Sequence, residues 1–158
     1  MTPAEAAAAL FRAMPRPLTR GHLEEYGIEA VETTVPLIAR EILSLNLYWV
    51  LAAVDAQIPT KYRAVIKEAL FDAICNEWWD SGRFGSGSWS EYQRELAVRR
   101  EHYAHLVDCE GISHSGICAE VAGMIEDQGL ISSDDRSKML VLLIDFAPAS
   151  EYGRLLEE

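Results

Sequence analysis

Apolar residues recur every three to four positions along most of the chain, which is the period of an amphipathic α-helix. No stretch of useful length alternates residue by residue as a half-exposed strand would, and no internal repeat is present. Prolines, glycines and capping residues divide the pattern into segments. Six principal helices are expected, over residues 3–14, 34–57, 60 to about 79, 89–110, 113–128 and 133 to about 146. Short irregular helices are expected near residues 19–33, and a short terminal helix after Pro148.

Several of these segments carry capping signals at their ends. Thr2-Pro3-Ala4-Glu5 and Ser88-Trp89-Ser90-Glu91 each have the form of a capping box, in which a Ser or Thr and a Glu three positions later satisfy free backbone N–H groups of the first turn. Other segments are expected to begin or end at a cap or a glycine, at Thr19, Thr60, Gly111, Ser113 and Gly129.

Two segments are too apolar to lie on the surface of a monomer. The 34–57 helix is apolar around almost its whole circumference, and the run 139–144 is also apolar. Such helices belong at the centre of a bundle or at an interface between subunits. With 158 residues, 49% of them hydrophobic, the chain can bury one core but hardly two. We therefore predict one all-α domain, a helical bundle over residues 1–158 that self-associates.

The charge of the chain excludes some classes of partner. Fourteen Lys and Arg residues against 25 Asp and Glu give a formal net charge of −11, so the surface as a whole repels nucleic acid and anionic lipid. The imbalance is uneven, because residues 1–20 carry Arg12, Arg16 and Arg20 against Glu5 alone. This basic N-terminal edge is either a solvated helix end or a surface that meets the acidic face of another subunit.

The cysteines and the apolar runs favour a cytoplasmic protein. Three cysteines form an odd set, and the N-terminus lacks the basic start of a secretion signal, so free thiols are expected in place of a disulfide. The longest apolar run, over about residues 43–54, is interrupted by Ser44 and Asn46. It is shorter than the roughly 20 apolar residues of a membrane span, which predicts a core helix.

No motif with a known catalytic mechanism is present. The chain has no P-loop, no dinucleotide-binding glycine pattern, no His-Glu-x-x-His and no EF-hand loop. A di-iron bundle would need Glu-x-x-His on two helices, and no Glu in this chain has His three residues later. The sequence therefore favours a protein that is not an enzyme and has no assured cofactor.

One short region concentrates residues able to bind a metal. His105 and Cys109 are four positions apart on one predicted helix, and His114 and Cys118 repeat that spacing on the next. In a tight antiparallel hairpin, His105 would face Cys118 and Cys109 would face His114. Two thiolates and two imidazoles suit a tetrahedral zinc ion, with iron as the alternative metal. Two neighbouring residues are substitute ligands, His102 and Glu101.

Simpler interpretations of the same residues stay open. Cys118 lies among apolar residues and has the pattern of core packing, and Glu101 with His105 has the spacing of an ion pair on a helix surface. A redox pair of Cys109 with Cys118, or a Cys109 nucleophile with His105 or His114 as base, is a weaker hypothesis. Neither a Cys-x-x-Cys motif nor an orienting third group supports it.

Residues 78–89, between the third and fourth of the six principal helices, combine aromatic side chains with glycine and serine. Such a loop is typical of a ligand lid or a partner-binding patch, because Trp and Phe bury a large area. The residues expected to contact a ligand or partner are Trp78, Trp79, Arg83, Phe84 and Trp89. The alternative is that the aromatic rings close the end of the core and the glycines only let the chain turn.

The apolar 34–57 helix carries a narrow polar stripe formed by Glu41, Tyr48 and Asp55. In a bundle cavity, such carboxylates would act as an acid or a base, or would hold a small ligand. The alternative is the exposed edge of a mostly buried helix, because acidic groups are rarely fully buried.

Three functional hypotheses follow. The first is an acidic helical interaction module that binds a protein partner or a second copy of itself. The second is a metal-binding protein that uses the His/Cys residues at 105–118. The third is a bundle that binds or converts a small molecule in a cavity with Glu41 and Asp55.

Overall fold

The helices follow the caps and breaks of the sequence. The computed structural model describes residues 1–157, which form helices and connecting turns without a strand. Its α-helices are α1 (Pro3–Ala13), α2 (Arg20–Glu25), α3 (Val35–Gln57), α4 (Thr60–Ile74), α5 (Trp89–Asp108), α6 (His114–Asp127), α7 (Arg136–Asp145) and α8 (Ala149–Leu156). Short 3-10 turns cover Glu32–Thr34 and Ser133–Asp135. The all-α fold and its six longer helices agree with the prediction, while α2 and the turn before α3 occupy the irregular region expected near residues 19–33.

Four of the predicted N-caps are made, because Thr2, Thr19, Ser88 and Ser113 each accept a backbone N–H of the first turn through the side chain. The Thr2 hydroxyl accepts the Glu5 N–H at 3.1 Å, and the Glu5 carboxylate accepts the Thr2 N–H at 3.0 Å, which completes the capping box of α1. Ser88 caps α5 and Ser113 caps α6, each by accepting a backbone N–H from the third residue of the helix. The capping box expected at Ser88 is only half made within residues 1–157, because Glu91 donates its N–H to Ser88 but its carboxylate does not accept the Ser88 N–H. These bonds start the two helices that flank the segments proposed for function.

Both ends of α4 differ from the prediction. Thr60 is the first helical residue and Pro59 occupies the N-cap position, so the hydroxyl of Thr60 makes no cap. At the other end, α4 passes into a π-helix over Cys75–Trp79, where the Asp80 N–H donates to the Cys75 carbonyl five residues back at 2.9 Å. Such wide turns have no signature in hydrophobic periodicity, and they are frequent at functional sites.

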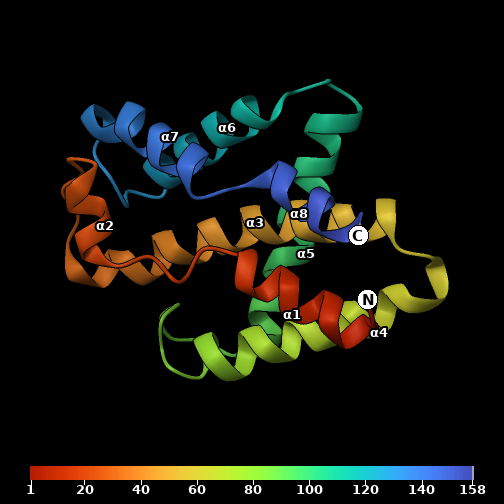
Figure 1. Cartoon of the computed structure of the whole chain (residues 1–158). Coiled ribbons are helices and arrows are strands. Elements are labelled where there is room, and N and C mark those ends of the chain that lie inside the picture. The colour runs from red at the N-terminus through yellow and green to blue at the C-terminus, as the bar shows by residue number, and fades with distance from the viewer. Residues whose placement is uncertain (158) are drawn as a thin grey trace.

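Figure 1 shows α3 at the centre of the molecule. The pair α1 and α4 packs on one side of it, the pair α6 and α7 lies on the other, and α8 runs beside it (Figure 1). Thirteen of the 23 residues of α3 are buried, which makes it the core helix that the sequence predicts. One contiguous apolar core joins residues from all eight helices, from Ala6 to Leu156.

The polar residues inside α3 have partners in other helices. The Ser44 hydroxyl is 2.9 Å from the Tyr92 hydroxyl of α5. The Asn46 amide donates to the Phe146 carbonyl at 2.8 Å and accepts from the Tyr152 hydroxyl at 2.7 Å. These bonds offset the cost of placing polar groups in a core, and they specify which helices lie against α3.

The apolar character of α3 is accounted for within one chain. The helix with its preceding turn is long and apolar enough to cross a membrane by composition, with a mean hydropathy of 1.5. However, 72% of that window is buried inside the fold, as in a core helix. The circumference of α3 is therefore covered by neighbouring helices and does not require a second subunit. On α7, by contrast, Val141 and Ile144 are exposed.

Candidate functional site

The aromatic residues that follow α4 form one cluster at the end of the bundle. Trp79 and Phe84 are buried, and their rings stack with centroids 5.7 Å apart. Trp89 and Tyr92, from the first turn of α5, contact Trp79 at centroid distances of 5.4 and 4.9 Å. These rings close the end of the core, so they offer little surface to a ligand. Trp78 differs from them because it is half-buried and lines an open groove.

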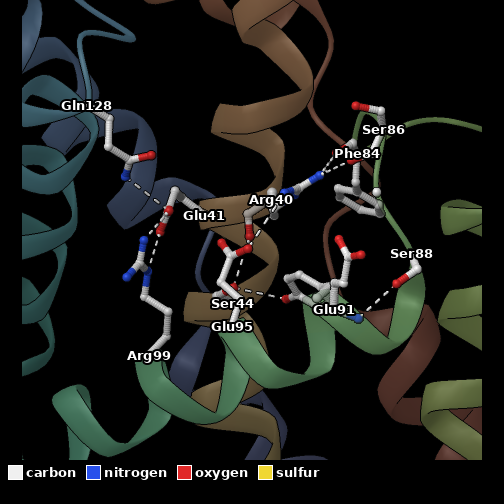
Figure 2. A network of polar contacts seen from close by, with 12 residues as sticks. Arg40, Glu41, Ser44, Phe84, Ser86, Ser88, Glu91, Glu95, Arg99 and Gln128 are labelled. Atoms are coloured by element: carbon white, nitrogen blue, oxygen red, sulfur yellow. Dashed lines mark hydrogen bonds and ion pairs between the residues drawn. The ribbon is translucent and has the colours of Figure 1, made fainter.

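The loop after the aromatic cluster is held by Arg40 of α3 (Figure 2). One nitrogen of the Arg40 guanidinium donates to the carbonyls of Phe84 and Ser86, both at 2.8 Å. The same group lies 5.2 Å from the Trp79 ring centroid and pairs with Glu95 of α5 at 3.6 Å. Because one rigid cation satisfies two loop carbonyls and stacks on a core ring, the loop has a defined shape.

A groove of about 770 Å³ opens beside this loop. Its walls are the last turn of α1, the linker that follows α1, and the segment after α4. Its apolar lining consists of Phe11, Met14, Pro17 and Trp78. The rings of Phe11 and Trp78 are 4.5 Å apart, which ties the wall from α1 to the wall from the π-helix.

Three arginines line the same groove and are exposed, namely Arg12, Arg16 and Arg83. Within residues 1–157 none of them forms an ion pair or a side-chain hydrogen bond, whereas the ion pairs occupy seven of the fourteen Lys and Arg side chains. Acidic residues outnumber basic ones on this chain, so three unpaired guanidinium groups around one hollow are a local reversal of charge. They leave fork-shaped donors free for carboxylates.

Two other ionisable residues line the groove. Glu77 contributes one carboxylate, so the three arginines are only partly offset. His22 is half-buried, and its Nδ1 accepts the Thr19 N–H at 3.1 Å as part of the cap of α2. The groove therefore combines an aromatic and aliphatic floor with a cationic rim.

The polar stripe on α3 divides into a buried part and an exposed part. Glu41 is buried, and its carboxylate accepts from Arg99 Nε at 3.1 Å, Arg99 Nη2 at 2.8 Å and Gln128 Nε2 at 3.1 Å (Figure 2). Asp55 is exposed and pairs with Lys67 at 2.6 Å. Tyr48 is half-buried and packs against the Tyr103 ring at 5.6 Å.

The stripe does not assemble as one site. Glu41 has a structural role, because it joins α3 to α5 through a bidentate ion pair with Arg99 and to the end of α6 through a bond from Gln128. Asp55 lies more than three helical turns further along α3 and faces solvent. The alternative of an exposed helix edge is therefore right for Asp55. It is wrong for Glu41, which is buried and whose charge is compensated by Arg99.

The His/Cys residues proposed as metal ligands are dispersed. His105 and Cys109 are exposed, while Cys118 is buried and lies 3.9 Å from His114 Nε2, measured from its sulfur. Of the substitutes, Glu101 is exposed, and His102 pairs with Glu120 at 3.2 Å. Among residues 1–157, no group of three His, Cys, Asp or Glu side chains lies close enough to hold a metal ion. Only His114 and Cys118 lie together, and both belong to α6, so the predicted pairing of residues across α5 and α6 does not form.

The environment of His114 and Cys118 favours their neutral forms. Burial raises the pKa of the Cys118 thiol to about 11 and lowers the pKa of His114 below its ordinary value. The His114 ring also packs edge-on against Trp49 at 5.3 Å. A thiol that stays protonated at neutral pH is a poor nucleophile and a poor metal ligand, so this pair has the character of core packing. The structure places all three cysteines as free thiols.

No family model, characterised protein or solved structure matches this chain. The geometry must therefore carry the functional argument. The groove joins two features that the sequence treats separately, the basic N-terminal edge and the aromatic segment after α4. The sequence indicates the excess of arginine at residues 12–20, but only the fold brings Arg12 and Arg16 beside Trp78 and Arg83.

Proposed function

We propose that this chain is a protein-interaction module whose groove binds an acidic segment of a partner protein. The observation that carries the proposal is the set of three unpaired arginines, Arg12, Arg16 and Arg83, around an apolar floor in a chain of net charge −11. The occupant we propose is an extended or turn-like segment with Asp or Glu residues on both sides of one apolar side chain.

The chemistry of the groove supports this occupant. Guanidinium groups bind carboxylates through two parallel hydrogen bonds, so each arginine selects an acidic residue by geometry as well as by charge. Phe11 and Trp78 provide an aromatic floor, and buried aromatic contacts supply most of the energy in many interfaces. Because Arg40 holds the adjacent loop, little conformational entropy is lost when a partner binds.

The overall charge argues against other anionic partners. A duplex or a membrane surface presents a broad array of negative charges, and the remainder of this acidic chain would face it and be repelled. A short acidic peptide meets the groove alone. The free thiols of all three cysteines fit a reducing compartment, so we propose that the module acts in the cytoplasm.

The proposal is tested by binding of a short fluorescein-labelled peptide in which Asp and Glu flank one Leu, measured by fluorescence anisotropy. Arg83→Glu should weaken the affinity about tenfold, because it replaces one attraction at the rim by a repulsion worth roughly 1.4 kcal/mol in total. The matched control is Arg94→Glu, which makes the same charge change at an exposed residue outside the groove. It should lower the affinity less than twofold at about 0.15 M salt, where distant charges are screened.

Three results would contradict the proposal. One is no binding of the peptide by the wild-type chain. The second is equal weakening by the two variants, which would show a general charge effect. The third is tight binding of a small carboxylate such as benzoate with no binding of the peptide, which would make the groove a small-molecule site.

A further inference from the structure

Resting on the proposed function, the geometry points to a second copy of this chain as the partner, with residues 29–32 as the acidic segment that enters the groove. This segment is Glu29-Ala30-Val31-Glu32, so one carboxylate precedes the valine and one follows it. Its chemistry is the complement of the groove. Val31 is 64% exposed, more than any other large apolar side chain of residues 1–157.

The backbone of this segment is anchored to the fold, while the Val31 side chain is exposed to solvent. Ile28 is buried, and the Glu29 N–H donates to the carboxylate of the buried Asp135 at 3.3 Å. Lys138 donates to the Gly27 carbonyl at 3.0 Å and pairs with Asp135 at 3.3 Å. A segment fixed in this way loses little conformational entropy on binding. Its exposed valine is therefore held in a defined position, where a partner can contact it.

The carboxylates of the segment are available to a partner. The Glu29 side chain forms no ion pair or hydrogen bond within residues 1–157, and Glu32 pairs only with Arg20 at 3.4 Å. Both members of that pair are more than half exposed, so the pair is weak and its carboxylate is free to exchange partners. The groove offers Arg12, Arg16 and Arg83 against Glu77 alone.

The segment and the groove lie at the same end of the molecule. Residues 29–32 come directly before α3, and the loop that contains Arg83 packs beside the first turns of α3, because Arg40 holds its carbonyls (Figures 1 and 2). Two copies related by a two-fold axis at this end can therefore exchange segments reciprocally. Each groove then receives the partner's Glu29, Val31 and Glu32, and the contact closes as a dimer instead of extending as a fibre.

The test is a charge exchange measured by light scattering after size-exclusion chromatography, at about 100 μM protein and low salt. The groove variant carries Arg12→Glu and Arg83→Glu, and the segment variant carries Glu29→Arg and Glu32→Arg. The wild-type chain should have twice the monomer mass of 17.6 kDa. Each variant alone should be monomeric, because like charges then face each other at both contacts. An equimolar mixture of the two should regain the dimer mass, because both contacts are again complementary. Circular dichroism of each variant shows that the fold is intact.

The failure of this inference is distinguishable from that of the proposed function. A monomeric wild-type chain, a variant that stays dimeric, or a mixture that stays monomeric overturns the reciprocal dimer. The labelled acidic peptide is then titrated into the segment variant, whose groove is unchanged and unoccupied. Binding there, with a monomeric wild-type chain, retains the interaction module and rejects self-recognition. Absence of binding rejects both.

Discussion

Removal of the Glu41 carboxylate should destabilise the fold by about 3 kcal/mol, which makes it a sharp test of the packing of α3, α5 and α6. In Glu41→Ala, three hydrogen bonds from Arg99 and Gln128 are lost, and the Arg99 guanidinium is left without its counter-ion. Breaking a buried ion pair from one side typically costs 3–5 kcal/mol. The Arg99 side chain is 22% exposed and can recover part of its hydration, so the lower end of this range applies. For a chain of this size, a loss of about 3 kcal/mol lowers the Tm by about 6–12 °C.

The assay is urea unfolding followed by circular dichroism, with the free energy of unfolding obtained by linear extrapolation. Glu101→Ala is the matched control, because Glu101 is exposed and makes no ion pair within residues 1–157; its effect should stay within about 0.5 kcal/mol. The double variant Glu41→Met with Arg99→Met should recover most of the loss, since no charge is then left unpaired. A Glu41→Ala protein as stable as the Glu101→Ala protein would refute the reasoning.

Three further predictions concern other parts of the core. Asn46→Leu should lower the free energy of unfolding by about 2 kcal/mol, because the Tyr152 hydroxyl and the Phe146 carbonyl lose their shared partner; urea unfolding of this variant against Tyr152→Phe checks it. A thiol reagent should label the exposed Cys109 quickly and the buried Cys118 only on unfolding, since burial raises the pKa of the Cys118 thiol to about 11; mass spectrometry of the labelled chain would contradict this if both reacted at one rate. Burial lowers the pKa of His114 below 6.5, so the unfolded state binds a proton more readily than the folded state. The free energy of unfolding should therefore fall as the pH drops below about 6.5. His114→Phe should flatten this part of the pH profile of stability, and an unchanged profile would argue against the prediction.

The helical architecture was predictable because its signals are local. Thr2, Ser88 and Ser113 start helices through bonds to residues three positions away. The apolar character of α3 around almost its whole circumference is also apparent from the sequence pattern alone. Such short-range rules place the starts of these helices and the burial of α3, although Thr60 makes no cap and Val141 and Ile144 of the apolar run 139–144 are exposed. They failed at the end of α4, where a π-helix replaces the last turn, because a wide turn changes the register without changing the composition.

The candidate sites depended on long-range packing and were less predictable. The spacing of His105, Cys109, His114 and Cys118 indicates a shared face only if α5 and α6 form a tight hairpin, and the structure leaves His105 and Cys109 in solvent. The burial of Glu41 was unpredictable for the same reason. Its charge is compensated by Arg99, which lies 58 residues away in the sequence. No local pattern encodes such a partner. The groove is likewise a product of the fold, since Arg12 lies in the last turn of α1 and Arg83 in the loop after α4, far apart in the sequence.

The measurement that tests the central claim most directly is an NMR titration, with the acidic peptide, of the ¹⁵N-labelled variant Glu29→Arg with Glu32→Arg, whose groove is unchanged and unoccupied. The account predicts that the Trp78 indole N–H and the backbone amides of residues 11–14, 16 and 77–83 shift, because these residues line the groove or lie next to residues that line it. Amides around Asp55 and the α5–α6 connection should stay in place. Shifts confined to those other surfaces, or no shifts at saturating peptide, would contradict the assignment of the groove as the binding site.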